Sequence, residues 1–130
     1  MHKLYSFCLI LFLLNSEKIY IKIYYTKDNL KEEGWVLNNK KTDYWFFYYQ
    51  NGKKKEEGHY KDGKKCKWWI FYNQENEISK KSEFNNNQPH GFTIIYKNKI
   101  IIKAEKYENG KFIKAWTDIE KFKMDNKVFL

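Results

Sequence analysis

The fold is decided by residues 48–72, YYQNGKKKEEGHYKDGKKCKWWIFY, because the pattern of this stretch occurs several times along the 130-residue chain. A tyrosine recurs every 24 residues, at Tyr24, Tyr48, Tyr72 and Tyr96. A fixed period of this length is typical of repeat proteins, in which each unit packs on its neighbours. The sequence therefore predicts about four 24-residue repeats.

Each repeat contains a turn, a polar strand, a second turn and an aromatic strand. Asn51-Gly52 is the clearest turn signal, because both residues tolerate a positive φ. The second turns are expected at Asn38-Asn39, Asp62-Gly63, Asn86-Asn87 and Asn109-Gly110. We expect polar strands at 30–36, 54–60, 78–84 and 100–107, and aromatic strands at 44–49, 68–72, 92–96 and 112–116.

These signals predict an all-β protein, built as an elongated antiparallel meander of β-hairpin repeats. Turn residues recur too often for long helices, and Tyr, Trp, Phe and Ile suit a pleated strand. The repeat domain is expected at 24–116. Residues 17–23 are expected to form a leading strand, and 117–130 to form a C-terminal cap that is either a last strand or a short helix.

The N-terminus has the pattern of a signal peptide. His2 and Lys3 precede an apolar run at 4–14, and a polar segment follows. The run is shorter than the roughly 20 residues of a membrane span but has the length of a signal-peptide core. We expect a signal helix within residues 1–16, its cleavage near Ser16, and a secreted or periplasmic protein. The alternative is that this run is a buried first helix or strand.

Composition and motifs argue against several function classes. The net charge is +9, but all 25 basic residues are lysine, and phosphate or guanine recognition favours the planar fork of arginine. A nucleic-acid partner is therefore not expected. Glu56 and Glu57 are adjacent, so a strand points them to opposite faces. His59 and Cys66 have no partners in a catalytic or ligand spacing. We expect no catalytic residues, no cofactor and no metal, and hence no enzyme.

The aromatic strands suggest a surface for contact. Alternation along the strands places Trp45, Trp69, Trp116, Phe47 and Phe71 on one face. If this face is exposed, it forms an apolar strip flanked by lysines and suited to a protein or a glycan. If the sheet curls, the strip is an inner wall. These five residues are the candidate interaction surface.

The repeat also resembles a known family. Gly34-Trp35, Asn51-Gly52, Glu57-Gly58-His59-Tyr60 and Gly91-Phe92 resemble the MORN repeat in its bacterial variant form. The resemblance covers about 24–116 and implies an elongated meander of hairpins. Bacterial proteins of this type include YwqK-like antitoxins, and other MORN proteins associate with phospholipid membranes or serve as scaffolds. The expected function is protein–protein interaction outside the cytoplasm. The alternatives are neutralisation of a partner toxin and binding to a lipid or cell surface.

Overall fold

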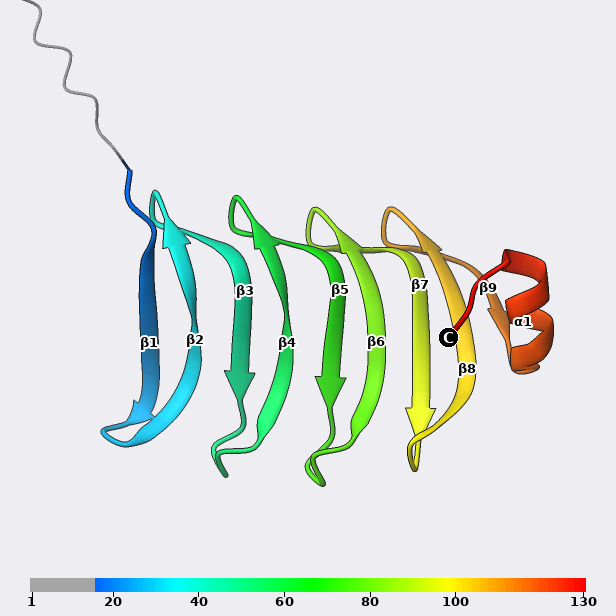
Figure 1. The fold of residues 1–130 in the computed structure, drawn as a ribbon, viewed down its shortest axis with the longest axis horizontal. Helices are drawn as coiled ribbons and strands as arrows, with labels where there is room; N and C mark the ends of the chain where they lie inside the picture. Colours follow the sequence, from blue (N-terminus) through cyan, green and yellow to red (C-terminus); the bar gives the residue numbers. More distant parts are fainter. Residues whose placement is uncertain (1–15) are drawn as a thin grey trace, which may run out of the picture.

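The structure of the protein is a computed structural model, which describes residues 16–130 (Figure 1). Its strands form one open antiparallel sheet in which each strand pairs with the next along the chain. The elements are β1 (Ile19–Thr26), β2 (Asn29–Leu37), β3 (Lys40–Tyr48), β4 (Lys54–Lys61), β5 (Lys64–Tyr72), β6 (Ile78–Asn85), β7 (Gln88–Lys97), β8 (Ile100–Glu108), β9 (Lys111–Trp116) and α1 (Ile119–Asn126). The predicted all-β meander of hairpins is confirmed. The predicted signal peptide lies, apart from Ser16, outside the described residues.

Short turns fix the register of the hairpins. In five of them the two central residues both have a positive φ, the geometry that matches the natural twist of paired strands. These central pairs are Asn38 and Asn39, Asp62 and Gly63, Asn86 and Asn87, Asn98 and Lys99, and Asn109 and Gly110. Four of the five are the second turns that the sequence predicts, so local turn chemistry sets where these strands end.

A bulge recurs at one position of the repeat. Asp43, Lys67 and Gly91 stand 24 residues apart and have φ values of 56°, 60° and 108°. On β3 the bulge inserts residues opposite β2, because Gly34 pairs with Trp45 whereas Trp35 pairs with Thr42. Bulges bend the strand and increase its twist. The strands accordingly bend along the array, as Figure 1 shows.

The C-terminal tail is a helix, which decides between the two predicted forms of the cap. Asp118 accepts a hydrogen bond from the backbone N–H of Lys121 and caps the start of α1. Lys127 follows the helix in a left-handed conformation and caps its C-terminal end. Phe122 is fully buried against the β7–β9 end of the sheet, where it packs with Ile94 and Trp116. The helix therefore covers one face of the sheet at one end of the array.

The sheet has two distinct faces. Residues that pair across antiparallel strands share a face. One row of paired residues contains Gly34, Trp45, Gly58, Trp69, Ser82 and Thr93; we call this side the tryptophan face. The neighbouring row contains Phe46, Glu57, Ile70, Lys81, Ile94, Ala104 and Trp116. Because α1 packs on this second side, we call it the helix face.

Candidate functional site

The tryptophan face contains two indole rings in equivalent positions of successive repeats. Trp45 packs against the backbone of Gly34, and a Cβ added to that glycine would lie 2.4 Å from the ring. Trp69 packs in the same way on Gly58, where the corresponding distance is 2.3 Å. A side chain larger than hydrogen at either glycine would therefore occupy the space of the ring. The glycine–tryptophan pair is a packing unit of the repeat.

Each indole also replaces a hydrogen bond that the bulge removes from the ladder. Trp45 Nε1 donates to the carbonyl oxygens of Trp35 and Thr42, at 2.9 and 3.2 Å. Trp69 Nε1 donates to the carbonyl oxygen of His59 at 3.1 Å. Buried backbone carbonyls need a donor, since leaving one unpaired costs about 1–3 kcal/mol. The two rings therefore stabilise the bulged backbone as well as the core.

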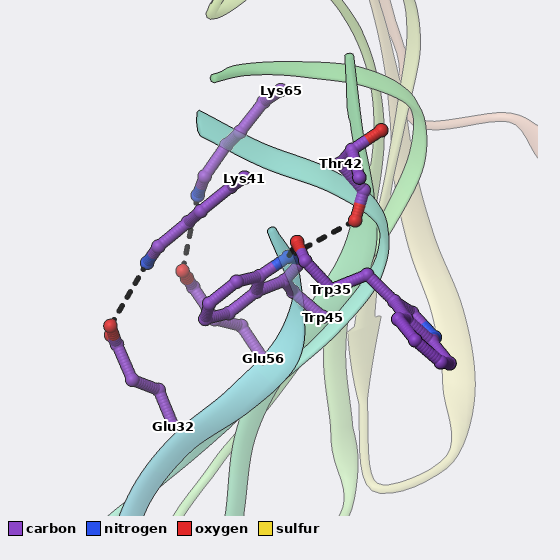
Figure 2. A network of polar contacts seen from close by, with 7 residues as sticks. All are labelled: Glu32, Trp35, Lys41, Thr42, Trp45, Glu56 and Lys65. Carbon is purple, nitrogen blue, oxygen red and sulfur yellow. Dashed lines mark hydrogen bonds and ion pairs between the residues drawn. The ribbon is translucent and has the colours of Figure 1, made fainter. Parts of the chain in front are cut away.

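A lysine covers each of these rings, and Figure 2 shows the lysine over Trp45. Lys41 Nζ lies 4.3 Å from the ring centroid of Trp45 and 3.0 Å from Glu32 Oε1. Lys65 takes the equivalent place 24 residues later, with its Nζ 4.0 Å from the Trp69 ring and 3.1 Å from a carboxylate oxygen of Glu56. The ammonium group is attracted to the ring and to the carboxylate at once. Because of this cover and the curved strands, both indoles are 0% exposed.

The other aromatic residues of this face form a continuous stack with the indoles. Phe47 lies 6.0 Å from Trp69 between ring centroids, and Tyr60 lies 5.1 Å from Trp69. Phe71 is half-buried, and Lys80 Nζ lies 4.4 Å from the centroid of its ring. The indole is not continued in the next copy, where Ser82 and Thr93 share a buried hydrogen bond of 2.5 Å instead. The apolar strip on this face is thus strongest over β3–β6.

The structure brings four of the five predicted contact residues together. Trp45, Phe47, Trp69 and Phe71 share the tryptophan face, with both indoles buried and both phenyl rings half-buried. This arrangement corresponds to the alternative in which the strip is an inner wall. The placement of Trp116 on the same face is wrong. Trp116 pairs with Ala104 on the helix face, and its Nε1 donates to Asp125 of α1.

The error arises because the alternation of side chains between the two faces shifts by one residue in the last repeat. The bulge of the earlier repeats leaves two residues of the aromatic strand unpaired, as between Thr42 and Trp45, whereas the bulge on β9 leaves one, between Phe112 and Lys114. Ala115 and not Trp116 therefore continues the row of Trp45 and Trp69. A one-residue offset moves every side chain to the other face of a sheet. The contact role of the five residues remains a prediction.

Sequence reasoning did not select the exposed aromatic residues of the helix face. Trp35 and Trp68 are 39% and 41% exposed, and Tyr20 is 40% exposed. Tyr20 and Trp35 pack edge to face with ring centroids 5.2 Å apart. Figure 2 shows the ring of Trp35 pointing away from that of Trp45, which is covered. The signal lay in the doublet Trp68-Trp69: neighbouring strand residues point to opposite faces, so one indole had to lie on each side.

Tyrosines and glutamates form repeated hydrogen bonds on the helix face. Tyr48 donates to Glu33 Oε1 at 2.7 Å, and Tyr72 donates to Glu57 Oε1 at 2.9 Å. Glu57 Oε2 accepts no hydrogen bond of good geometry but lies 2.7 Å from Lys54 Nζ. Burial and the adjacent carboxylate raise the pKa of Tyr72 to about 12. These carboxylates are held by partners and serve the packing of the sheet.

An apolar groove lies on the helix face, next to the part of the sheet that α1 covers. Its volume is about 600 Å³, and β5–β7, α1 and the C-terminal residues form its walls. Lys81 and Glu83 are its polar members. The apolar lining consists of Trp68, Ile70, Phe92, Ile94, Tyr96, Phe122, Val128, Phe129 and Leu130. The exposed ring of Trp68 thus stands at the wall of a hollow that admits an apolar side chain.

The structure shows the surroundings of Glu56, Glu57 and His59, the titratable residues considered in the sequence. Glu56 and Glu57 point to opposite faces as predicted, since they pair with Phe47 and Phe46 respectively. His59 stacks edge-on against Tyr44 at 4.8 Å, and burial with the nearby charge of Lys67 lowers its pKa. Among residues 16–130, no three or more His, Cys, Asp and Glu side chains gather as metal ligands. Within the same range, no helix has the length and apolar character of a membrane span.

No protein-family model matches the chain, and no curated protein matches it either.

Proposed function

We propose that the protein is a non-enzymatic MORN-variant repeat protein that acts outside the cytoplasm by binding another protein through the helix face of its sheet. The observation that carries the proposal is the exposure of Tyr20, Trp35 and Trp68 on that face. Large aromatic side chains that stand in water on one face are typical of protein interfaces, where they supply most of the binding free energy.

The helix face fits this role better than the tryptophan face does. Trp45 and Trp69 are fully buried and already hold the bulged backbone through their indole N–H groups. A partner would have to displace Lys41 and Lys65 to reach them. Trp35 and Trp68 need no such rearrangement, because their rings are already exposed.

The chemistry of the face indicates the kind of partner. The groove beside Trp68 is mostly apolar, with Lys81 and Glu83 as its polar members. The protein as a whole carries a net charge of +9. A partner that inserts an apolar side chain into the groove and surrounds it with acidic residues complements both properties. Opposite net charge also raises the rate of association.

The test is affinity capture from the native cell with matched variants. We expect the Trp35→Ala/Trp68→Ala double variant to lose the captured protein, because both substitutions remove exposed rings. The control is Phe112→Ala on β9, which removes an aromatic ring elsewhere on the sheet that is more exposed (58%) than either tryptophan. Thermal unfolding of all variants verifies that their stability is unchanged. Capture of the same protein by the double variant would contradict the proposal.

The N-terminus and the identity of the captured protein separate the alternatives. Mass spectrometry of the mature N-terminus measures whether residues 1–16 are removed, as the extracytoplasmic proposal requires. A captured toxin together with an intact N-terminus would favour the antitoxin-like alternative instead.

A basic groove favours a second candidate, which is contact with an anionic lipid or cell surface. This groove of about 320 Å³ lies between hairpin turns and is lined by Lys40, Lys61, Lys64 and Lys65, with Asp62 among them. Sedimentation with anionic vesicles tests it. Binding that falls steeply with salt and is lost in Lys40→Gln/Lys61→Gln/Lys64→Gln would support this candidate, because exposed charges are screened. Binding by the triple variant equal to that of wild type would contradict it.

A further inference from the structure

The two edges of the sheet are protected to different degrees. At one edge β9 has six residues, and α1 follows it and packs against β8 and β9. At the other edge β1 has eight residues and pairs with β2. In residues 16–130 no other element lies along the outer side of β1. An uncovered edge strand presents unpaired backbone N–H and C=O groups and is a template for another strand.

The sequence of β1 lacks the features that normally block edge pairing. It contains no proline or glycine, and Lys22 is its one charged residue. Ile19, Tyr20, Ile23 and Tyr24 are 61%, 40%, 40% and 46% exposed. Protein edges are commonly guarded by several charges, by proline or by a covering element. The apolar and aromatic content of β1 is instead that of a strand with neighbours on both sides.

We propose that the outer edge of β1 pairs with β1 of a second copy of the protein, antiparallel and around a two-fold axis perpendicular to the sheet. This self-association through the β1 edge is separate from the binding of another protein that we propose for the helix face. The two sheets then continue into one, and each β1 exchanges its free backbone hydrogen bonds with its equivalent. Such an isologous interface requires the strand to be complementary to itself.

Charge selects the register of this pair. Pairing that is centred on Lys22 places Lys22 against its own equivalent, and pairing centred on Tyr20 places Lys18 against Lys22. Like charges directly opposite each other are destabilising. Pairing centred on Ile21 avoids both contacts. It places Ile19 against Ile23 and Tyr20 against Lys22.

The same register agrees with the geometry of β1. Its pairing with β2 is continuous from Ile19 to Ile23 and shifts at Tyr24 and again before Thr26. Ile21 lies at the centre of the regular part. A lysine next to a tyrosine is a contact that this sheet already uses, since Lys81 Nζ lies 5.7 Å from the Tyr96 ring. Because a two-fold axis perpendicular to the sheet keeps equivalent residues on the same face, the Tyr20 and Trp35 residues of both copies then lie on one continuous helix face.

The experiment measures the mass of the protein in solution over a range of concentrations. We use protein purified from the native cell, so that it carries its natural N-terminus. Wild type is expected to shift from monomer to dimer as the concentration rises. The single variants Ile19→Lys and Ile23→Glu each place a charge opposite an isoleucine and are expected to weaken the dimer at least tenfold. The double variant Ile19→Lys/Ile23→Glu is expected to recover it, because the introduced charges face each other across the two-fold axis.

Ile100→Lys is the matched control, since Ile100 is a 67% exposed isoleucine on β8, away from the edge. It is expected to dimerise like wild type. Amide hydrogen exchange of unmodified protein supplies a readout that requires no variant: protection in β1 is expected to increase with protein concentration. A wild type that stays monomeric, single variants that dimerise normally, or exchange in β1 that is independent of concentration would overturn the proposal. A double variant that stays monomeric would overturn the Ile21-centred register.

Discussion

Gly58 makes room for the ring of Trp69: a Cβ at Gly58 would lie 2.3 Å from Trp69 Cδ2. The same relationship joins Gly34 and Trp45 in the preceding repeat. In the following repeat both partners change together, to Ser82 and Thr93, which share a hydrogen bond. The identity of the residue on one strand is therefore tied to the identity of its partner on the next.

This relationship predicts a coupling between substitutions. Gly58→Ser is expected to destabilise the protein by about 1–3 kcal/mol, because the new side chain collides with the ring. Trp69→Thr is expected to cost about 3–5 kcal/mol through the lost core volume. The double variant reproduces the Ser82–Thr93 pair and should cost less than the sum of the single variants. Chemical denaturation measures all three free energies of unfolding, and strictly additive values would contradict the coupling.

The lysine cover predicts an effect of Lys65 on both stability and fluorescence. Lys65→Ala is expected to lower the free energy of unfolding by about 1–2 kcal/mol, because the ring loses its cation and Glu56 loses its ion pair. Tryptophan emission should shift to longer wavelength as water reaches Trp69. Lys64→Ala is the control, because Lys64 precedes Lys65 on the same strand and is exposed. Equal effects of the two substitutions would contradict the assigned role of Lys65.

The hydrogen bond from Tyr72 to Glu57 predicts a dependence on alkaline pH. Burial and this carboxylate raise the pKa of Tyr72 from 10.0 to about 12 in the folded protein. The folded state therefore holds the phenol proton more tightly than the unfolded state. The resulting stabilisation is present below pH 10 and is lost as the pH rises toward 12. Denaturant unfolding in this range should show a steeper loss for wild type than for Tyr72→Phe, and identical slopes would contradict the assignment.

The packing of α1 predicts that Phe122 contributes far more to the free energy of unfolding than Met124 does. Phe122 is fully buried, whereas Met124 is 73% exposed on the same helix. Phe122→Ala is expected to cost about 3–5 kcal/mol and to increase hydrogen exchange in β8 and β9 first. Met124→Ala should change the free energy of unfolding by less than about 0.5 kcal/mol. Similar effects at both positions would show that α1 does not stabilise the sheet.

The sequence determined the strands and turns well because those features depend on local chemistry. Asn51-Gly52 and Asp62-Gly63 favour turns whatever the tertiary contacts are, and the 24-residue period identifies the repeat unit. The form of the tail was undecided because Phe122 is apolar in either a strand or a helix, and only its packing against Ile94 and Trp116 decides between them.

The side on which each aromatic residue lies was harder to predict. Side-chain alternation is broken by each bulge, and Lys67 at a bulge position gives no local sign of its positive φ. The burial of Trp45 was not predictable because it depends on Lys41 and on the curvature of the sheet. For the same reason, the sequence alone does not show that the rings of Trp35 and Trp68 are exposed.

Contact between the helix face and another protein can be tested by site-specific photo-crosslinking in the native cell. A photoreactive phenylalanine analogue replaces Trp68 in one variant and Phe112 in a second. We expect a covalent adduct of one defined mass with a second protein from position 68, and none from position 112. Absence of an adduct at position 68, or the same adducts at both positions, would contradict it.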